Sequence, residues 1–426
     1  MKFHLTALIL FVSTFGFSQS DFTLTQFTLK DSTKIKTGLW IEQSFNSNVI
    51  NNSVVFNLAM KNGPTFQSMQ NMKNRVNNSN RAGYNGFERV YYVQKLNSKS
   101  DSVALTGFFS LHSSRQITAK FGEDALRLIA YGNKEFAGKK ADVNNLNVLL
   151  QQYTSIQFGI TRTRDKKTFG IAPSVVIGNK MARVNSEGGF LYTSPIGDSV
   201  YAEAKGTFSQ NDTSSKLAYD PNGIGAAIDL FYSMPFDIFR KNESIGQLTF
   251  EVNDLGFMVW NKNTLTYSID GNYSWAGFKA PTLFDLNDSI ISSQQPNDIE
   301  RSFLRKTESG TINAMLPVRF SVRYAEQLND RVLLTANLQQ RFFSNMLPFI
   351  GLDQEIRLND GNKPVAYNLR FHESFGGYNY AGLGAGFSVS APAFDLVVGS
   401  RNIIGLTNPE YFSGFNVHLG FHWKFF

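Results

Sequence analysis

The sequence contains no cysteine, so neither disulfide bonds nor thiolate metal sites can hold the fold together. The same absence excludes a lipid-modified N-terminal cysteine, so the chain is not a lipoprotein. Long hydrophobic runs are missing as well, because no stretch of about 18 or more apolar residues follows Phe17. A bundle of transmembrane helices is therefore excluded.

Motifs that carry chemistry are also scarce. Histidine occurs only five times, and His112-Ser113-Ser114 is too common a composition to indicate a hydrolase. His418 and His422 have a spacing that suits a metal on a helix, but on a strand they fit ordinary polar positions better. Gly223 and Gly225 lack the turn into a helix that a phosphate-binding loop requires. We therefore predict no enzyme, no metal centre and no cofactor.

The N-terminus indicates export. Met1-Lys2 is a short positive start, and the apolar run Leu5–Phe17 has the size of a signal-peptide core. The small residues Gly16 and Ser18 place cleavage after residue 18, although a buried N-terminal helix is the alternative. An exported chain of this length can form two or three soluble domains or one large barrel.

The net charge of +7 comes from scattered Lys and Arg residues rather than from a basic arm. Export excludes a nucleic acid as the partner. The phosphates of lipopolysaccharide, a polar lumen or plain solubility account better for the excess of positive charge.

Period-two alternation is the dominant pattern, and 14% of the residues are aromatic. A transmembrane strand alternates between lipid and lumen, so this composition predicts an all-β protein, a closed antiparallel transmembrane β-barrel. A soluble sandwich or solenoid also alternates, but these strands are long and the pattern persists to the last residue. The stretches with the clearest alternation are 54–60, 103–111, 156–160, 200–208, 248–252, 318–324, 332–339, 365–372, 383–389 and 415–425.

We count about fourteen strands, with 12 to 16 open, because a single-chain barrel closes with an even number. Residues 19–52 precede the first clear strand and are predicted to be a periplasmic or plug segment, with the barrel at 53–426. Helical spacing occurs at 121–138, and a long polar insertion at 279–310 includes a predicted helix at 298–306. We place these last two outside the barrel or in its lumen. Turns are predicted at 270–272, 329–330 and 360–362.

The last strand carries a more specific pattern. It resembles the C-terminal signal that the barrel assembly machinery recognises in its substrates: a polar residue, a glycine two positions later and closing hydrophobic residues. The pattern falls on His418, Gly420, Trp423, Phe425 and the terminal Phe426. Lipid, lipopolysaccharide and this machinery are the partners that the pattern implies.

Charged residues on alternating positions are the candidates for the lumen. Arg319, Arg323 and Arg370 alternate with apolar neighbours, and Glu251 and Glu203 are candidate partners for them. They either line a path through the barrel or form a polar network that fills it, and the second reading is favoured.

A second set of residues predicts local backbone features. Asp229 and Asp254 could form a carboxylate pair, but their glycine neighbours favour turns or bulges in which a short acid bonds the backbone. This set is Gly223, Gly225, Asp229, Asp254 and Gly256.

Several segments resemble an uncharacterised family of outer-membrane barrels found in gliding and gut Gram-negative bacteria. The resemblance rests on 223–230, on 253–256 with Trp260, on Leu316-Pro317 and on 382–386. Such barrels are similar in architecture to the FadL-type fatty-acid transport barrels, with fourteen strands and an N-terminal plug, and to the PorV-type shuttle barrels of type IX secretion. The plug motif of the fatty-acid transporters has no match in residues 19–52, so a hydrophobic ligand path does not follow.

Three functions are compatible with these patterns. The leading one is passive transport of a small solute or amphiphile across the outer membrane. A non-conducting scaffold of a secretion or assembly complex comes second, with Phe342-Phe343 and Phe349 as its apolar loop surface. An outer-membrane enzyme comes third.

Export gives the first testable expectation. Protein purified from outer membranes should begin at Gln19, because the signal peptide is removed during export. Intact-mass measurement checks this, and a mature chain that still begins at Met1 would contradict it.

Overall fold

The computed structural model describes residues 22–29, 32–60, 64–96, 103–211, 221–239, 246–275, 304–360, 363–379 and 381–426. Within them, fourteen strands close into one antiparallel ring, as the alternation predicts. Each strand pairs with its neighbours in chain order, and the last strand pairs with the first. The ring runs through β1 (Ile35–Ser47), β2 (Asn80–Leu96), β3 (Val103–Phe121), β5 (Asn147–Arg164), β6 (Lys167–Thr193), β8 (Gly223–Pro235), β9 (Gln247–Trp275), β11 (Arg319–Asn329), β12 (Val332–Arg341), β13 (Phe349–Arg357), β14 (Ala366–Gly376), β15 (Gly382–Ser390), β16 (Phe394–Ser400) and β17 (Phe415–Phe425).

The outer face of the ring is apolar. Successive side chains of a strand point to opposite faces, so the alternating hydrophobic residues all point outward while their polar neighbours point into the lumen. The exposed apolar residues of this belt include Val90, Leu111, Phe158, Ile160, Val175, Phe257, Leu338, Ile350, Phe371, Val417 and Trp423. A closed ring with an apolar outer belt is the form of an outer-membrane protein, and this is where the protein resides.

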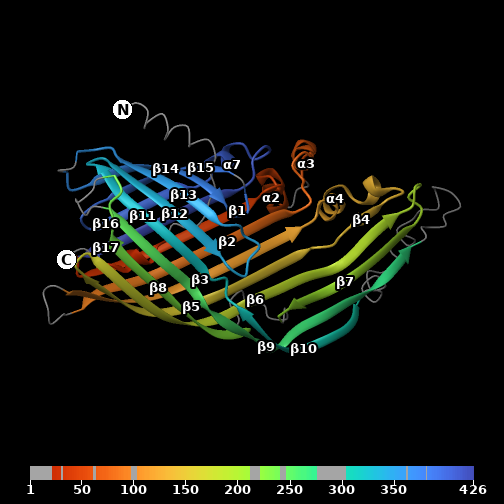
Figure 1. Ribbon diagram of the computed structural model, residues 1–426, viewed down its shortest axis with the longest axis horizontal. Coiled ribbons are helices and arrows are strands. Elements are labelled where there is room, and N and C mark those ends of the chain that lie inside the picture. Colours follow the sequence, from red (N-terminus) through yellow and green to blue (C-terminus); the bar gives the residue numbers. More distant parts are fainter. Residues whose placement is uncertain are drawn as a thin grey trace.

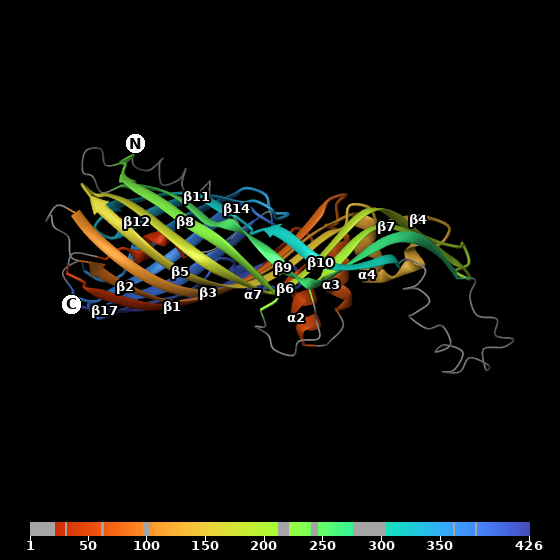
Figure 2. The same ribbon diagram turned by 90° about the horizontal axis from the view of Figure 1, so that it is seen from below.

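Two strands are far longer than a membrane requires. β6 has 27 residues and β9 has 29, whereas a tilted strand crosses the bilayer in about 9–11. Beyond the ring, β6 and β9 pair with β4 (Lys140–Asp142), β7 (Val200–Gln210) and β10 (Leu304–Met315), in the order β4-β6-β7-β9-β10. This projecting sheet, which we call the blade, extends from one side of the barrel (Figures 1 and 2).

The lengths of the connections orient the barrel. Strands β5 and β6 are joined by the short turn at Asp165-Lys166, and β11 and β12 by Asp330-Arg331, on the end of the barrel that also holds the C-terminus (Figure 1). The opposite end carries the blade and the longer connections. Because periplasmic turns are short and extracellular loops are long, the blade lies on the outside of the cell.

Short helices cover part of the outer end. The β1–β2 connection contains α2 (Asn52–Ala59) and α3 (Phe66–Lys73), the β3–β5 connection contains α4 (Glu123–Tyr131) and the 3-10 helix η2 (Asn133–Phe136), and the β16–β17 connection contains α7 (Ile403–Thr407). The first and last of these connections are joined by the Asn52 side-chain amide, which donates to the carbonyls of Gly405 and Gly414 at 2.7 and 2.8 Å.

The lumen contains an apolar cluster built around the N-terminal segment. Residues 22–29 form the short 3-10 helix η1 (Leu24–Phe27) inside the ring, and Phe22, Leu24 and Phe27 are at most 2% exposed. They pack against inward side chains of the wall, including Trp40 and Tyr91. Each buried apolar side chain of this kind contributes about 1.5–3 kcal/mol, so the segment is firmly docked. We call residues 22–29 the plug.

The predicted boundary between the N-terminal segment and the barrel was wrong. The first strand begins at Ile35 rather than after residue 52. Its alternation is obscured because Trp40 points inward, against the plug, where a polar residue was expected. The strand predicted at 54–60 is instead helix α2, whose first turn is capped by the Asn51 side chain accepting from the Val54 N–H at 3.1 Å.

The other predicted breaks had mixed outcomes. The helix in 121–138 is present as α4, whereas the turn expected at 270–272 lies within β9, paired with β7. Of the helix predicted at 298–306, residues 304–306 begin β10, and the remainder lies outside the described residues, as do residues 361–362 of the last predicted turn. No helix in the described part of the chain is long and apolar enough to cross a membrane.

Packing of β17 against β1 gives a stability prediction. A Cβ on Gly420 would lie 2.5 Å from the indole of Trp40, which is buried and stacked on the imidazole of His418. We expect Gly420→Val to destabilise the barrel by about 1–3 kcal/mol through overpacking. The measurement is the temperature at which the folded, heat-modifiable band disappears on electrophoresis. This temperature should be lower for the variant than for the unaltered protein.

Gly310→Val is the matched control, because a Cβ on Gly310 of β10 meets no atom within 4 Å. Equal thermal stability of the two variants would contradict the packing argument.

Candidate functional site

Inward side chains of the described residues line a series of cavities, of which four follow one another along the barrel axis. From the outer end they are the mouth cavity of about 480 Å³, the constriction of about 40 Å³, the central cavity of about 100 Å³ and the exit cavity of about 370 Å³. The constriction and the central cavity share Arg319 as a wall residue, and the central and exit cavities share Gln26, Glu355, Arg370 and Val397. The lumen therefore holds two larger cavities near its ends and two small ones between them.

The mouth cavity lies where the blade joins the barrel. β6 and β7 contribute Arg183 and Ser209, and β10 contributes residues 312–315. The β12–β13 connection closes another side with Phe343, Ser344 and Asn345. Its walls combine amide, hydroxyl and apolar groups, so the cavity suits an amphipathic or small polar solute better than a purely apolar one.

The constriction is built on a β-bulge between β8 and β9. Pairing shifts between Ile228 and Leu230, and Asp254 has a φ of 57°, a left-handed conformation. The carboxylate of Asp229 accepts the Asp254 N–H at 2.7 Å and the side-chain amide of Gln157 at 2.7 Å. Asp229 thus bonds the backbone of the bulge, which is the role that its glycine neighbours predicted.

Glycines allow these two strands to approach each other. A Cβ on Gly225 would overlap the carbonyl oxygen of Phe257, and a Cβ on Gly256 would overlap that of Ala226. A Cβ on Gly223 would lie 3.0 Å from the carbonyl oxygen of Val259. The close approach holds the Asp254 carboxylate toward the lumen, a position that the sequence did not predict.

Two hydrogen bonds and one longer polar contact cross the constriction from Asp254. Its carboxylate accepts the hydroxyl of Tyr153 at 3.1 Å, and it lies 3.8 Å from Nε2 of His112. An Arg89 guanidinium nitrogen lies 3.0 Å from Nδ1 of His112. Because the guanidinium can only donate, Nδ1 accepts and the imidazole proton lies on Nε2, facing Asp254. The constriction is therefore held by side chains that restrain one another.

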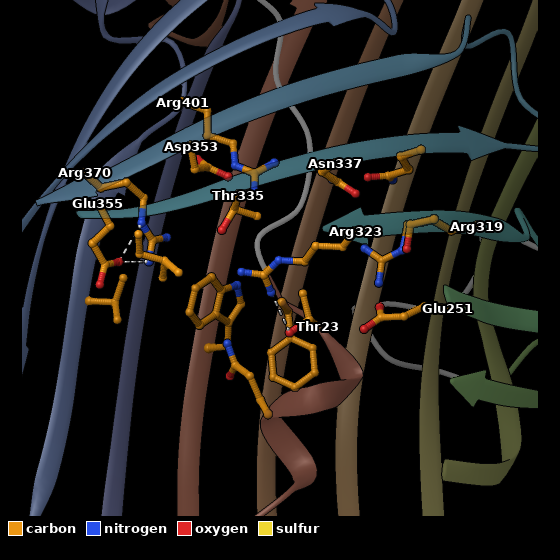
Figure 3. Close-up of a pocket in the computed structure, with 17 residues that line it drawn as sticks. Thr23, Glu251, Arg319, Arg323, Thr335, Asn337, Asp353, Glu355, Arg370 and Arg401 are labelled. Carbon is orange, nitrogen blue, oxygen red and sulfur yellow. Dashed lines mark hydrogen bonds and ion pairs between the residues drawn. The ribbon is translucent and has the colours of Figure 1, made fainter. Parts of the chain in front are cut away.

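The central cavity brings together four of the five charged residues proposed for the lumen. Arg319, Arg323, Arg370 and Glu251 all line it (Figure 3). The fifth, Glu203, does not: it is an exposed residue of β7 in the blade, opposite Asn272. Residues of the blade alternate between two faces just as residues of the barrel wall do. The sequence pattern therefore does not distinguish a strand of the blade from a strand of the barrel.

The plug forms one wall of this cavity. The carboxylate of Glu251 accepts the backbone N–H of Leu24 at 3.0 Å. The guanidinium of Arg323 donates to the Thr23 hydroxyl at 3.4 Å (Figure 3). On the far side of the plug the Phe27 and Phe108 rings stack at 3.9 Å, and the Arg89 guanidinium lies 4.5 Å from the Phe22 ring centre. Polar and apolar contacts together hold the plug across the lumen.

The exit cavity opens toward the periplasmic end, between the plug and strands β14 to β17. Lys36 donates to the Gln26 carbonyl and, at 3.3 Å, to the Thr28 carbonyl, so the first residues of β1 hold the end of the plug. Lys424 pairs with Asp395 at 2.7 Å across the mouth of this cavity.

One arrangement that the sequence did not reveal resembles a hydrolase triad. Nε2 of His372 lies 2.7 Å from the Ser374 hydroxyl, and its Nδ1 lies 2.6 Å from the Asp353 carboxylate. The side chain of Ser374 is fully buried and lines none of the four cavities. Asp353 lies opposite His372 in the pairing of β13 with β14, so the three residues form a polar ladder between these strands.

The residues of the predicted assembly signal occupy both faces of β17. His418 and His422 point inward and stack near Trp40, with ring centres 5.7 and 6.4 Å away. Trp423 and Phe425 are each 47% exposed on the outer side, and the terminal Phe426, beyond the end of the strand, is 57% exposed. Among the described residues, no group of three or more His, Asp or Glu side chains is placed to hold a metal ion.

Arg89, Tyr153, Arg341 and Arg401 also line the lumen, although the sequence did not single them out. Arg89 and Tyr153 lie on strands whose inward faces mix aromatic and polar residues, which obscures the alternation. Arg401 follows β16 in a connection, where period two gives no signal.

The chain has several matches among known proteins. Among solved structures, the chain is similar to a Pseudomonas aeruginosa FadL homologue (10% identity, TM-score 0.45, covering 92% of this chain and 91% of that one) and to the P. putida toluene transporter TodX (9%, 0.42, 94% and 92%). It also matches the translocator domain of the autotransporter NalP from Neisseria meningitidis (8%, 0.33, 93% and 90%). Scores this low carry no conclusion about function, and no curated protein matches the sequence.

A family model gives the more direct assignment. It matches residues 29–400, which include every strand of the ring except β17. The chain belongs to the family of unknown function DUF5723.

Proposed function

We propose that this barrel is a gated passive channel that carries a small solute or amphiphile across the outer membrane. The observation that carries the proposal is the series of cavities from the outer mouth to the periplasmic exit, interrupted by the constriction and by the plug. A barrel that served only as an anchor would have no need for a cavity at each end and a docked segment between them.

The contacts of the plug suggest how the path opens. Its polar attachments are a few hydrogen bonds, from Glu251, Arg323 and Lys36, and each contributes about 1.5–3 kcal/mol at most when a charged group takes part. Displacement of the plug toward the periplasm would join the central and exit cavities without breaking any strand pairing.

The plug therefore gives a direct test. A variant lacking residues 22–29 should show resolvable single-channel conductance in a planar bilayer, whereas the intact protein should show little or none. The deletion must stop short of Ile35, because removing β1 would open the ring. Phe158→Ala, which removes an exposed, lipid-facing side chain of β5, is the control and should leave conductance unchanged. Failure to conduct of both the deletion variant and the same variant with Tyr153→Ala, which widens the constriction, would refute the channel.

The constriction gives a second test, made in the background that lacks the plug. Tyr153 is buried and lines the narrowest cavity, so Tyr153→Ala should raise single-channel conductance. Tyr367→Ala removes an equal volume from a half-exposed outward residue of β14 and should have no effect. Equal conductance of both variants would show that the constriction at Tyr153 is not the part of the lumen that limits conductance.

A second role, as a non-conducting scaffold in a secretion or assembly complex, is supported by one observation. Phe342 and Phe343 are 50 and 57% exposed at the outer end, where a partner could bind them. Phe349, proposed for the same surface, is instead fully buried with Met346 and Tyr378 inside the barrel. Co-purification of a partner that Phe342→Ala with Phe343→Ala abolishes would favour this role.

A further inference from the structure

Charges in the central cavity do not balance. Four arginines, Arg319, Arg323, Arg370 and Arg401, line it together with three carboxylates, Glu251, Asp353 and Glu355. The space they enclose, about 100 Å³, holds several waters or one small charged group. An excess of positive charge in such a space attracts an anion, because nearby apolar walls reduce screening by water.

The three carboxylates already have partners. Glu355 forms an ion pair with Arg370, accepting from two guanidinium nitrogens at 2.7 and 3.2 Å. Asp353 lies 2.6 Å from Nδ1 of His372, and Glu251 accepts the N–H of Leu24. Glu355 and Arg370 thus neutralise each other, and Glu251 and Asp353, which also bond Leu24 and His372, still leave the four arginines with one more charge than the three carboxylates supply.

Two of the remaining arginines donate hydrogen bonds to neutral groups. Arg319 donates to the side-chain oxygen of Asn253, and Arg323 donates to the Thr23 hydroxyl at 3.4 Å. Both sit on the inward face of β11, four residues apart, and both point into the cavity opposite the plug (Figure 3). Guanidinium groups held in this way present paired N–H donors that match the geometry of an oxyanion.

We propose that the central cavity is a binding site for an oxyanion, a carboxylate or phosphate group, held by Arg319 and Arg323. This inference rests on the proposed channel for its role, since it assigns the class of solute that the channel selects. Arg323 also bonds the plug, so an anion that recruits its guanidinium removes one of the contacts that keep the plug in place.

Equilibrium binding tests the site without any need for conduction. Titration calorimetry of the intact, detergent-solubilised mature chain with inorganic phosphate, and separately with butyrate, should give saturable binding. Loss of one charge-assisted contact should raise the Kd about tenfold in Arg323→Gln and in Arg319→Gln. Stronger binding of phosphate indicates a free inorganic ion as the ligand, and stronger binding of butyrate indicates the carboxylate of an organic solute.

Arg331→Gln is the matched control, because Arg331 is 59% exposed at a periplasmic turn and pairs with Asp360. It removes the same charge and should leave the Kd unchanged. Absence of saturable binding to the folded protein, or equal Kd values in Arg323→Gln and Arg331→Gln, would overturn the oxyanion site.

Reversal potentials separate this inference from the channel itself. In the variant lacking residues 22–29, a KCl gradient should give a reversal potential that favours chloride, and Arg319→Gln with Arg323→Gln should shift it toward potassium. Conduction without any preference for chloride would overturn the anion site and leave the channel standing. Binding of phosphate without conduction would support the site and refute the channel.

Discussion

Closure of the sheet between β1 and β17 is the contact on which the other features of the protein depend. The pairing runs without a break from Ile35 opposite Phe425 to Phe45 opposite Phe415. Hydrocarbon offers no water to an unpaired N–H or C=O, so a strand edge left open in the membrane would cost several kcal/mol for each unsatisfied group. Closure also creates the lumen, because only in a closed ring do inward side chains from fourteen strands face one another.

What fills the lumen determines how the barrel can work. A plug of eight residues, docked by three buried apolar side chains, meets a wall that is rich in charged and amide groups. The network of Arg89, His112, Asp254 and Tyr153 holds the constriction, while Glu251 and Arg323 reach the plug itself. The wall is therefore held by strand pairing, and the plug is held by side-chain contacts and by no strand pairing.

The blade adds a second level of organisation at the outer end. Because β6 and β9 continue past the bilayer, they carry β7 and β10 with them, and the base of this sheet becomes a wall of the mouth cavity. A solute would meet the largest cavity first, then the narrowest one, and then the arginines of the central cavity.

The sequence by itself determined the class of fold. Alternation in strands such as 318–324 and 332–339 follows from one face in lipid and one in the lumen, a local property of each strand, and it predicted about fourteen strands and the inward positions of Arg319, Arg323 and Arg370. It failed at β1, where Trp40 packs inward against the plug, and at Glu203, which alternates in a sheet outside the membrane. Only the tertiary structure decided that Asp229 and Asp254 meet at one bulge, that Phe349 is buried, and that the plug touches Glu251 across a sequence separation of 227 residues. These contacts depend on strand register and on closure of the ring, which bring together residues that no local pattern connects.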